Sequence, residues 1–204
     1  MRRFAQAYCA LALISIASIA AQAQTAPAYT DGGELIRPTD YRGWVFLTSG
    51  LDMFYGELAR AGARPSVFDN VFVTRDAYAH FMRTGTWPDK TMFILELRSA
   101  ESGVSIDNAG RTQGGVVAIE AAVKDLERFS GSNGWGYFTF DSAEGLLDAA
   151  PALPTTAACY ACHATHTAVD NTFVQFYPTL LEVAERFGTV KATYDPTRKA
   201  IPAP

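Results

Sequence analysis

The chain has 204 residues, three cysteines and a formal net charge of −4 at pH 7. This length favours a single domain with one sizeable core, and the acidic balance excludes nucleic acid and anionic membrane surfaces as partners. Three cysteines are too few for a disulfide framework.

The first 23 residues have the pattern of a secretory signal peptide. Arg2 and Arg3 form a positive start, an uncharged apolar run covers residues 10–20, and small residues surround Gln22 at a cleavage site that ends with Ala23. The apolar run is shorter than the roughly 20 residues that cross a bilayer. We therefore expect export to the periplasm of a bacterium or to the medium, with no membrane insertion after cleavage. The mature chain would keep 181 residues and a net charge of −6, because both arginines are lost.

The predicted elements of the mature chain begin with a loose N-terminal lead-in at residues 24–40, a segment rich in small and polar residues. One domain is expected over residues 41–204. Its first segment, 41–61, mixes aromatic residues with helix formers and predicts a helix that is interrupted near Ser49 and Gly50. A strand is predicted at 67–74 and a short helix at 76–84, which Gly85 ends.

Three more strands follow, at 91–98, 114–123 and 135–140, with a turn at Pro88 before the first of them. Ser142 is a plausible N-cap for a helix at 142–150. Apolar residues then recur at helical spacing from 173 to 184, where Pro178 is expected to start a second helix. Together these elements predict an α+β fold, in which helices flank an antiparallel sheet of about four to five strands.

The cysteines carry the clearest chemical signal. Cys9 would leave with the signal peptide, and Cys159 and Cys162 stand three positions apart, directly before His163. C-x-x-C-H is the attachment sequence of c-type haem, in which two thiols form thioethers with the haem and the histidine ligates the iron. The motif predicts one covalently attached haem on a helix near the C-terminus, with His163 as its axial iron ligand.

A redox dithiol and a zinc site are the alternative interpretations of this motif. A thioredoxin-type dithiol opens a helix in a βαβ unit, but no strand is predicted directly before Cys159. A zinc site would use both cysteines with His163 and His166. Four ligands within eight residues, two of them adjacent, are cramped for a tetrahedron.

The sixth coordination position of the iron has several possible protein ligands. They are His80, His166, Met53, Met82 and Met92. Methionines are more often core residues than ligands, and His166 follows His163 too closely to reach the other side of the iron. We expect no sixth protein ligand and an open or aromatic-capped distal site.

Several motifs, in this order and spacing, resemble the cytochrome P-460 family. They are YRGW at 41–44, NVFV at 70–73, WPD at 87–89, EAAVKD at 120–125, GWGYF at 134–138 and the C-terminal C-x-x-C-H. The resemblance covers roughly residues 41–181 and implies an antiparallel sheet over the haem and a homodimer. Members of the P-460 type oxidise hydroxylamine with a haem that is cross-linked to a lysine. Relatives called cytochrome c′-beta lack the cross-link and bind nitric oxide or carbon monoxide.

The residue at the cross-link position differs from the family pattern. There the lysine directly precedes a Glu-Leu pair, which is Glu96-Leu97 here, and the preceding residue is Leu95. Residues 91–97 contain no lysine, and Lys90 would lie on the opposite strand face, so it is better explained as a turn residue. The resemblance therefore implies a haem c without a lysine cross-link.

The same strand face carries Phe93, Leu95 and Leu97, which would form an apolar distal wall. Such a wall favours small gaseous ligands and suggests a gas-binding or electron-transferring cytochrome of the c′-beta kind, with a redox partner protein. One alternative is an oxidoreductase acting on hydroxylamine or nitric oxide, which needs a group that takes protons. A second alternative is a simple electron-carrier cytochrome c with a sixth ligand. Three carboxylates precede the haem motif and could approach the distal face as a group that takes protons: Asp141, Glu144 and Asp148. Solvated side chains of a helix are the more common state of such residues.

Overall fold

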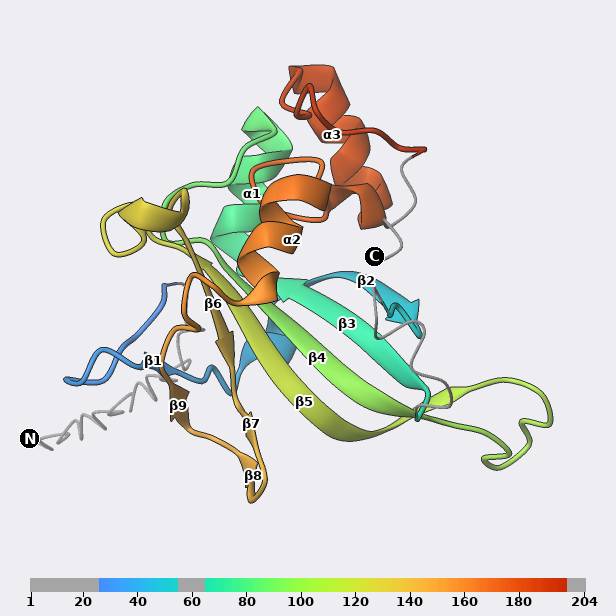
Figure 1. Ribbon diagram of the computed structural model, residues 1–204. Helices are drawn as coiled ribbons and strands as arrows, with labels where there is room; N and C mark the ends of the chain where they lie inside the picture. Colours follow the sequence, from blue (N-terminus) through green and yellow to red (C-terminus); the bar gives the residue numbers. More distant parts are fainter. Residues whose placement is uncertain (1–25, 55–64, 198–204) are drawn as a thin grey trace, which may run out of the picture.

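An antiparallel five-stranded sheet forms the centre of the protein in the computed structural model, which describes residues 26–54 and 65–197. Its strands are β2 (Val45–Leu51), β3 (Val67–Val73), β4 (Met92–Glu101), β5 (Thr112–Lys124) and β6 (Trp135–Thr139), in the spatial order β2-β3-β4-β5-β6. Strands that follow one another in sequence are also neighbours in the sheet. The helices gather on one side of it (Figure 1), and the predicted α+β fold is confirmed.

The register of the sheet decides which side chains face the helices. Leu95 of β4 lies opposite Val71 of β3 and Glu120 of β5. Because side chains alternate along a strand, these three residues share one face with the core residue Phe93, while Glu96 lies on the other face. The helices therefore cover the face that carries Leu95.

In the described ranges, three α-helices and three short 3-10 helices accompany the sheet. Helix α1 (Arg75–Thr84) ends at Gly85, whose positive φ of 70° lets its N–H reach the carbonyl of Phe81. Helix α3 (Pro178–Phe187) starts at Pro178, as predicted. Helix α2 (Ala158–His166) contains the C-x-x-C-H motif. The 3-10 helices are η1 (Tyr41–Gly43), η3 (Ser130–Ser132) and η4 (Val174–Phe176).

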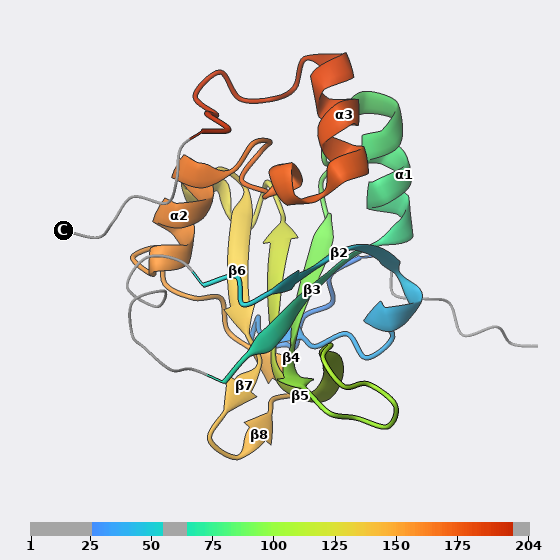
Figure 2. The same ribbon diagram turned by 90° about the vertical axis from the view of Figure 1, so that its right-hand side faces the viewer.

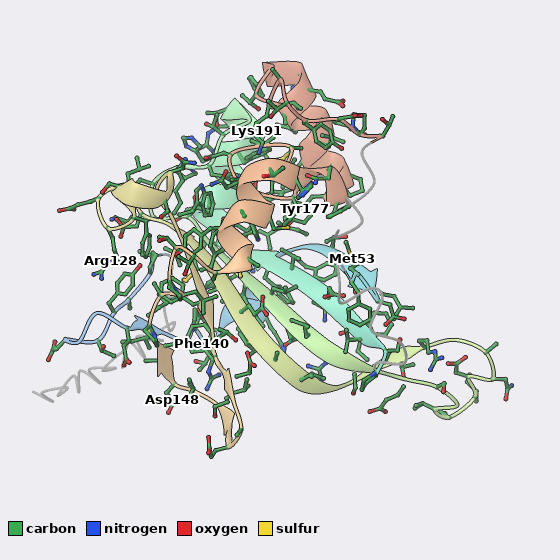
Figure 3. The ribbon with its side chains drawn as sticks, viewed as in Figure 1. Met53, Arg128, Phe140, Asp148, Tyr177 and Lys191 are labelled. Carbon is green, nitrogen blue, oxygen red and sulfur yellow. The ribbon has the colours of Figure 1, made fainter. Side chains whose placement is uncertain are left out.

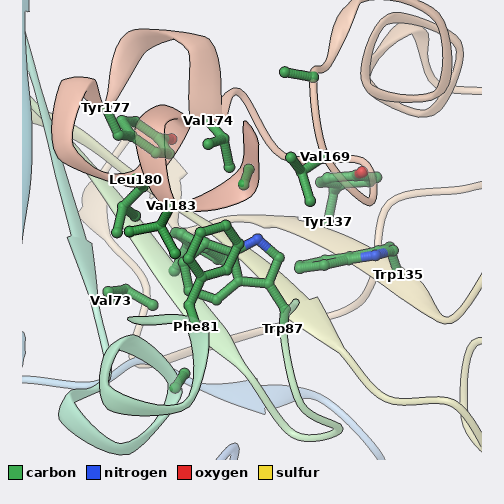
Figure 4. Close-up of a cluster of buried hydrophobic side chains, with 14 residues drawn as sticks. Val73, Phe81, Trp87, Trp135, Tyr137, Val169, Val174, Tyr177, Leu180 and Val183 are labelled. Atoms are coloured by element: carbon green, nitrogen blue, oxygen red, sulfur yellow. The ribbon is translucent and has the colours of Figure 1, made fainter. Parts of the chain in front are cut away.

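Separate apolar cores lie on the two faces of the sheet. On the helix side, Phe81 packs against Trp87 (Figure 4), with ring centroids 4.1 Å apart. Trp87 also packs edge-on against Phe93 at 4.8 Å. On the opposite side, Ile94 and Phe138 belong to a second cluster. The first core is the surface on which α2 and α3 are seated.

Two predicted helices are wrong. The segment 41–61 begins with η1 and continues as strand β2, because the run Val45-Phe46-Leu47 suits a strand and β3 supplies its hydrogen-bond partners. Residues 55–61 of that prediction lie outside the described part of the chain. Residues 142–150 form no helix but three two-residue strands, β7 (Asp141–Ser142), β8 (Gly145–Leu146) and β9 (Ala149–Ala150).

Ser142 therefore closes a hairpin instead of capping a helix. Its hydroxyl donates to the carbonyl of Gly145 at 2.8 Å and accepts from the N–H of Glu144. Gly145 has a φ of 124°, which is a conformation that suits glycine. Local side-chain bonds of this kind compete with helix formation.

The loose lead-in predicted for residues 24–40 is also wrong for the described residues 26–40. Strand β1 (Leu35–Ile36) pairs with β9, and Leu35 is 0% exposed in the second core. The guanidinium of Arg128 lies over the ring of Tyr29 at 3.9 Å. The packed part of the protein thus starts before residue 41, because β9 offers this segment a pairing partner from far along the chain.

The predicted signal peptide, residues 1–23, lies outside the described residues. In the described ranges, no helix combines the length and apolar character needed to cross a bilayer.

Candidate functional site

Helix α2 carries Cys159, Cys162 and His163 at relative positions i, i+3 and i+4, which lie on one face of a helix. The helix starts after a turn in which the N–H of Ala157 bonds the carbonyl of Pro154. Figure 2 shows α2 beside β6, near one end of the sheet. The side chain of Tyr160 anchors it there, with its hydroxyl 3.1 Å from the carbonyl of Leu153.

The imidazole of His163 is held on three sides. Its ring centroid lies 4.4 Å from that of Tyr137 and 4.7 Å from that of Phe173. Its Nδ1 is 2.8 Å from the backbone oxygen of Asn171. A carbonyl only accepts, so Nδ1 carries the proton and donates, and Nε2 keeps a lone pair. Burial lowers the pKa of His163, which favours the neutral form that can ligate iron.

The carbonyl of Asn171 is presented by a turn that is tied to the sheet. Asp170 and Asn171 both have a positive φ, at 42° and 57°. The carboxylate of Asp170 accepts from Nζ of Lys124 at 2.6 Å and from Nε1 of Trp135 at 3.2 Å. This arrangement joins the end of β5 and the start of β6 to the loop that orients His163.

The two cysteines are partly buried free thiols. They form no disulfide, and burial raises the pKa of both, with the charge of Glu120 adding to the effect at Cys159. A reactive dithiol needs a lowered pKa, so the structure does not favour that alternative. No group of three or more His, Cys, Asp or Glu side chains in the described part of the chain could hold a metal ion, which removes the support for zinc.

Beside α2, the sheet presents an apolar surface. Leu95 and Leu97 of β4 are partly exposed on the helix side, as is Val71 on β3. Phe93 shares this face, but its ring is buried in the aromatic core between Trp87 and Trp135. Leu95 and Leu97 are therefore the members of the predicted wall that remain partly accessible.

Glu120, which no sequence pattern singled out as a functional residue, lies directly across from Leu95 on β5. Part of the Glu120 side chain is exposed, but many protein groups lie around its carboxyl. This burial raises the pKa of Glu120, and the negative charges of Asp141 and Asp69 raise it further. Period-two alternation along β5 could have assigned Glu120 to the face opposite Ile119. Its position next to Leu95 depends on the register between strands, which the pattern does not give.

The three carboxylates suggested from the sequence behave differently from one another. Asp141 accepts a hydrogen bond from the hydroxyl of Thr139 and is close enough to influence Glu120. Glu144 is exposed in the β7–β8 hairpin, and Asp148 pairs with Arg37 at 3.0 Å. Figure 3 shows Asp148 on the β8–β9 side of the molecule, away from α2. Of the three, Asp141 alone approaches the helix-side face.

The candidate sixth ligands are also spread over the structure. Met92 is fully buried in the core on the opposite face of the sheet, and Met82 packs on α1 against the first core. His166 ends α2, and His80 lies on α1. The N–H of Met53 donates to the carboxylate of Asp69 at 3.4 Å. The sheet lies between Met92 and His163, so Met92 cannot ligate an iron that is bound to His163.

The described lysines are all engaged away from Leu95. Lys90 occupies a turn with a φ of 62°, and its Nζ lies 2.6 Å from Asp125, so its interpretation as a turn residue is confirmed. Lys124 binds Asp170, and Lys191 donates to the carbonyl of Ala164 at the end of α2.

These residues fit a c-type haem. Two protonated thiols and a neutral imidazole with a free Nε2 lie on one helix face, next to an apolar sheet surface. The hydroxyl of Tyr137, which packs on His163, is buried with no hydrogen-bond partner within the described ranges. A buried hydroxyl without a partner is unusual, and it marks a place where a bound group would supply one.

Comparison with known proteins agrees with this chemistry. A family model described as cytochrome P-460 matches residues 38–174, two thirds of the chain, and the match includes all three residues of the haem motif. No significant match was found among curated proteins. The chain therefore belongs to the cytochrome P-460 family of haem proteins, whose cofactor is haem c.

Proposed function

We propose that the protein binds a small neutral diatomic ligand, nitric oxide or carbon monoxide, at a haem c held by Cys159, Cys162 and His163. The observation that carries this proposal is the place of Leu95. It lies on the helix-side face between Val71 and Glu120, and it stands where the family pattern has its cross-linking lysine. Leucine has no nucleophile, so this position cannot bond to the porphyrin.

The apolar surface around Leu95 suits such a ligand. A neutral diatomic loses little hydration on entering it, whereas a polar substrate would lose hydrogen bonds to water that Leu95, Leu97 and Val71 cannot replace. The haem iron supplies the coordination site for the ligand. His163 would ligate the iron through the lone pair of Nε2, and Tyr137 and Phe173 hold its ring in place.

Glu120 favours a second candidate function, the oxidation of hydroxylamine or nitric oxide. A carboxyl group whose pKa is raised is suited to take and return protons, and it lies on the same face as Leu95. Glu120→Gln separates the two functions. A gas-binding protein keeps its carbon monoxide affinity, whereas an oxidase loses about 10²–10⁴-fold in turnover.

Mass spectrometry of a haem-peptide digest tests the proposal directly. We expect two thioether bonds, at Cys159 and Cys162, and an absorption spectrum of ordinary haem c in the reduced protein. Haem should stay with the chain on a denaturing gel, and replacement of both cysteines by alanine should abolish this. A third covalent attachment, for example through Lys90, would refute the gas-binding proposal and support the oxidase.

The proposed function also includes export, a redox partner protein and a homodimeric state. Cleavage after Ala23 and export would let the haem be attached outside the cytoplasm, and the N-terminal sequence of the mature protein tests this. Electron exchange with a redox partner protein and a homodimeric state also remain proposals. Light scattering of the purified haem-loaded protein measures its oligomeric state, and a monomeric mass would contradict the homodimer.

A further inference from the structure

We infer that Lys124 and Asp170 position the iron-binding histidine, because their ion pair holds the turn whose carbonyl accepts the Nδ1–H of His163. This inference rests on the proposed coordination of haem iron by His163. It assigns to two residues outside the C-x-x-C-H motif a role in setting the properties of the iron.

The turn has an uncommon backbone conformation. Asp170 and Asn171 follow each other with φ values of 42° and 57°. Positive φ is uncommon for residues other than glycine, although Asp and Asn adopt it most readily, so contacts with the surroundings add to the stability of two such residues in succession. An isolated bridge between Val169 and Thr172 closes the turn at its base.

The sheet side supplies contacts of this kind. Nζ of Lys124 donates both to Asp170 at 2.6 Å and to the backbone oxygen of Trp87 at 2.8 Å, and the Lys124 side chain is 13% exposed. Trp135 donates to the other oxygen of Asp170, and Nε1 of Trp87 donates to the hydroxyl of Thr172 at 2.8 Å. Both carboxylate oxygens of Asp170 are thus bound to residues of the sheet and its connections.

His163 itself comes from α2, whereas the acceptor of its Nδ1–H comes from this sheet-anchored turn. Hydrogen bonding of the second ring nitrogen fixes the orientation of an iron-bound imidazole and raises its basicity. Loss of the ion pair would let the turn relax and would lengthen the bond from His163 to Asn171. The bond between iron and His163 would then weaken.

Resonance Raman spectroscopy of the haem-loaded full chain measures this bond. The iron–histidine stretching frequency is recorded after photolysis of the ferrous carbon monoxide complex in wild type, Lys124→Met and Asp170→Asn. We expect a shift to lower frequency in both variants. Because one variant removes a cation and the other an anion, a purely electrostatic effect on the iron would shift the two frequencies in opposite directions.

Lys90→Met is the matched control, since Lys90 also forms a 2.6 Å ion pair with an aspartate, Asp125, at the same end of the sheet. It should leave the frequency unchanged. The double variant Lys124→Met/Asp170→Asn leaves no unpaired charge, which protects its folding. It should show the shift of a single variant and not the sum of two, because both changes break one interaction.

The results separate the inference from the proposed function. Failure to find covalent haem in the wild type refutes the proposed function. Covalent haem with an unchanged frequency in Asp170→Asn and in the double variant, or with opposite shifts in the two single variants, overturns the inference alone. Asp170→Asn keeps an oxygen for Nε1 of Trp135, so the test stands even if Lys124→Met does not accumulate.

Discussion

Glu96 is a buried carboxylate whose replacement tests how the sheet is held in register behind the site. It lies on β4 between Leu95 and Leu97 but faces the opposite side of the sheet. Its carboxylate accepts from the hydroxyl of Tyr41 and from Nε of Arg42 at 2.8 Å, and it pairs with Arg98 at 3.4 Å. Glu96→Gln removes the charge and keeps one acceptor.

The expected loss of stability follows from these contacts. Breaking a buried ion pair costs about 3–5 kcal/mol when the remaining charge stays buried. Here Arg42 is 55% exposed and Arg98 is 23% exposed, so both guanidinium groups can return to water. We therefore expect a loss of about 2–3 kcal/mol at neutral pH, which lowers the unfolding temperature of a domain of this size by about 5–10 °C.

The pKa of Glu96 determines how the stability of the protein depends on pH. Burial by itself would raise the pKa of Glu96, but hydrogen bonds from Tyr41 and Arg42 and the charges of both arginines outweigh it and lower the pKa below 4.5. The stabilisation is complete above the pKa of the unfolded chain and is lost as the pH falls through the lower folded value. The difference between wild type and Glu96→Gln should shrink below about pH 4.

Denaturant unfolding followed by circular dichroism at pH 7 and at acidic pH measures both effects. Glu101→Gln, at the exposed end of the same strand, is the control and should change the free energy of unfolding little. The haem spectrum should stay unchanged, because Glu96 faces away from α2. A loss below about 1 kcal/mol at pH 7, or a difference that persists undiminished in acid, would refute this reasoning.

Two further predictions concern the lead-in and the carboxylate beside Leu95. Leu35→Ala should lower the free energy of unfolding, measured with denaturant, by about 2–4 kcal/mol, because the Leu35 side chain is 0% exposed. Ile36→Ala is the control and should cost much less, because Ile36 is 39% exposed. Equal small losses in the two variants would mean that this segment is not packed. Glu120→Gln should raise the free energy of unfolding at neutral pH relative to wild type. Burial raises the pKa of Glu120 in the folded protein above the ordinary value of 4.5. Ionisation of Glu120 therefore lowers stability as the pH rises from the unfolded pKa through the folded pKa, and the stability gained by Glu120→Gln should vanish below about pH 4. A gain that grows in acid would contradict the pKa shift.

Local signals in the sequence determined much of the architecture. The C-x-x-C-H spacing places Cys159, Cys162 and His163 on one face of any helix, and the structure has that helix. Gly85 and Pro178 mark helix ends through their own backbone preferences, and the structure bears them out. These inferences succeeded because each depends on residues close together in the chain.

The tertiary structure decided what depends on distant partners. Strand β2 replaced a predicted helix because β3 pairs with it, and Leu35 is buried because β9 lies beside it. Leu95 and Glu120 meet through the register of β4 with β5, and Asp170 meets Lys124 across 46 positions. Propensity and periodicity assign a residue to an element or a face, but they carry no information about which strand lies opposite it. The helix that bears the haem motif could thus be read from the sequence, whereas the groups around it are set by pairing between segments far apart in the chain.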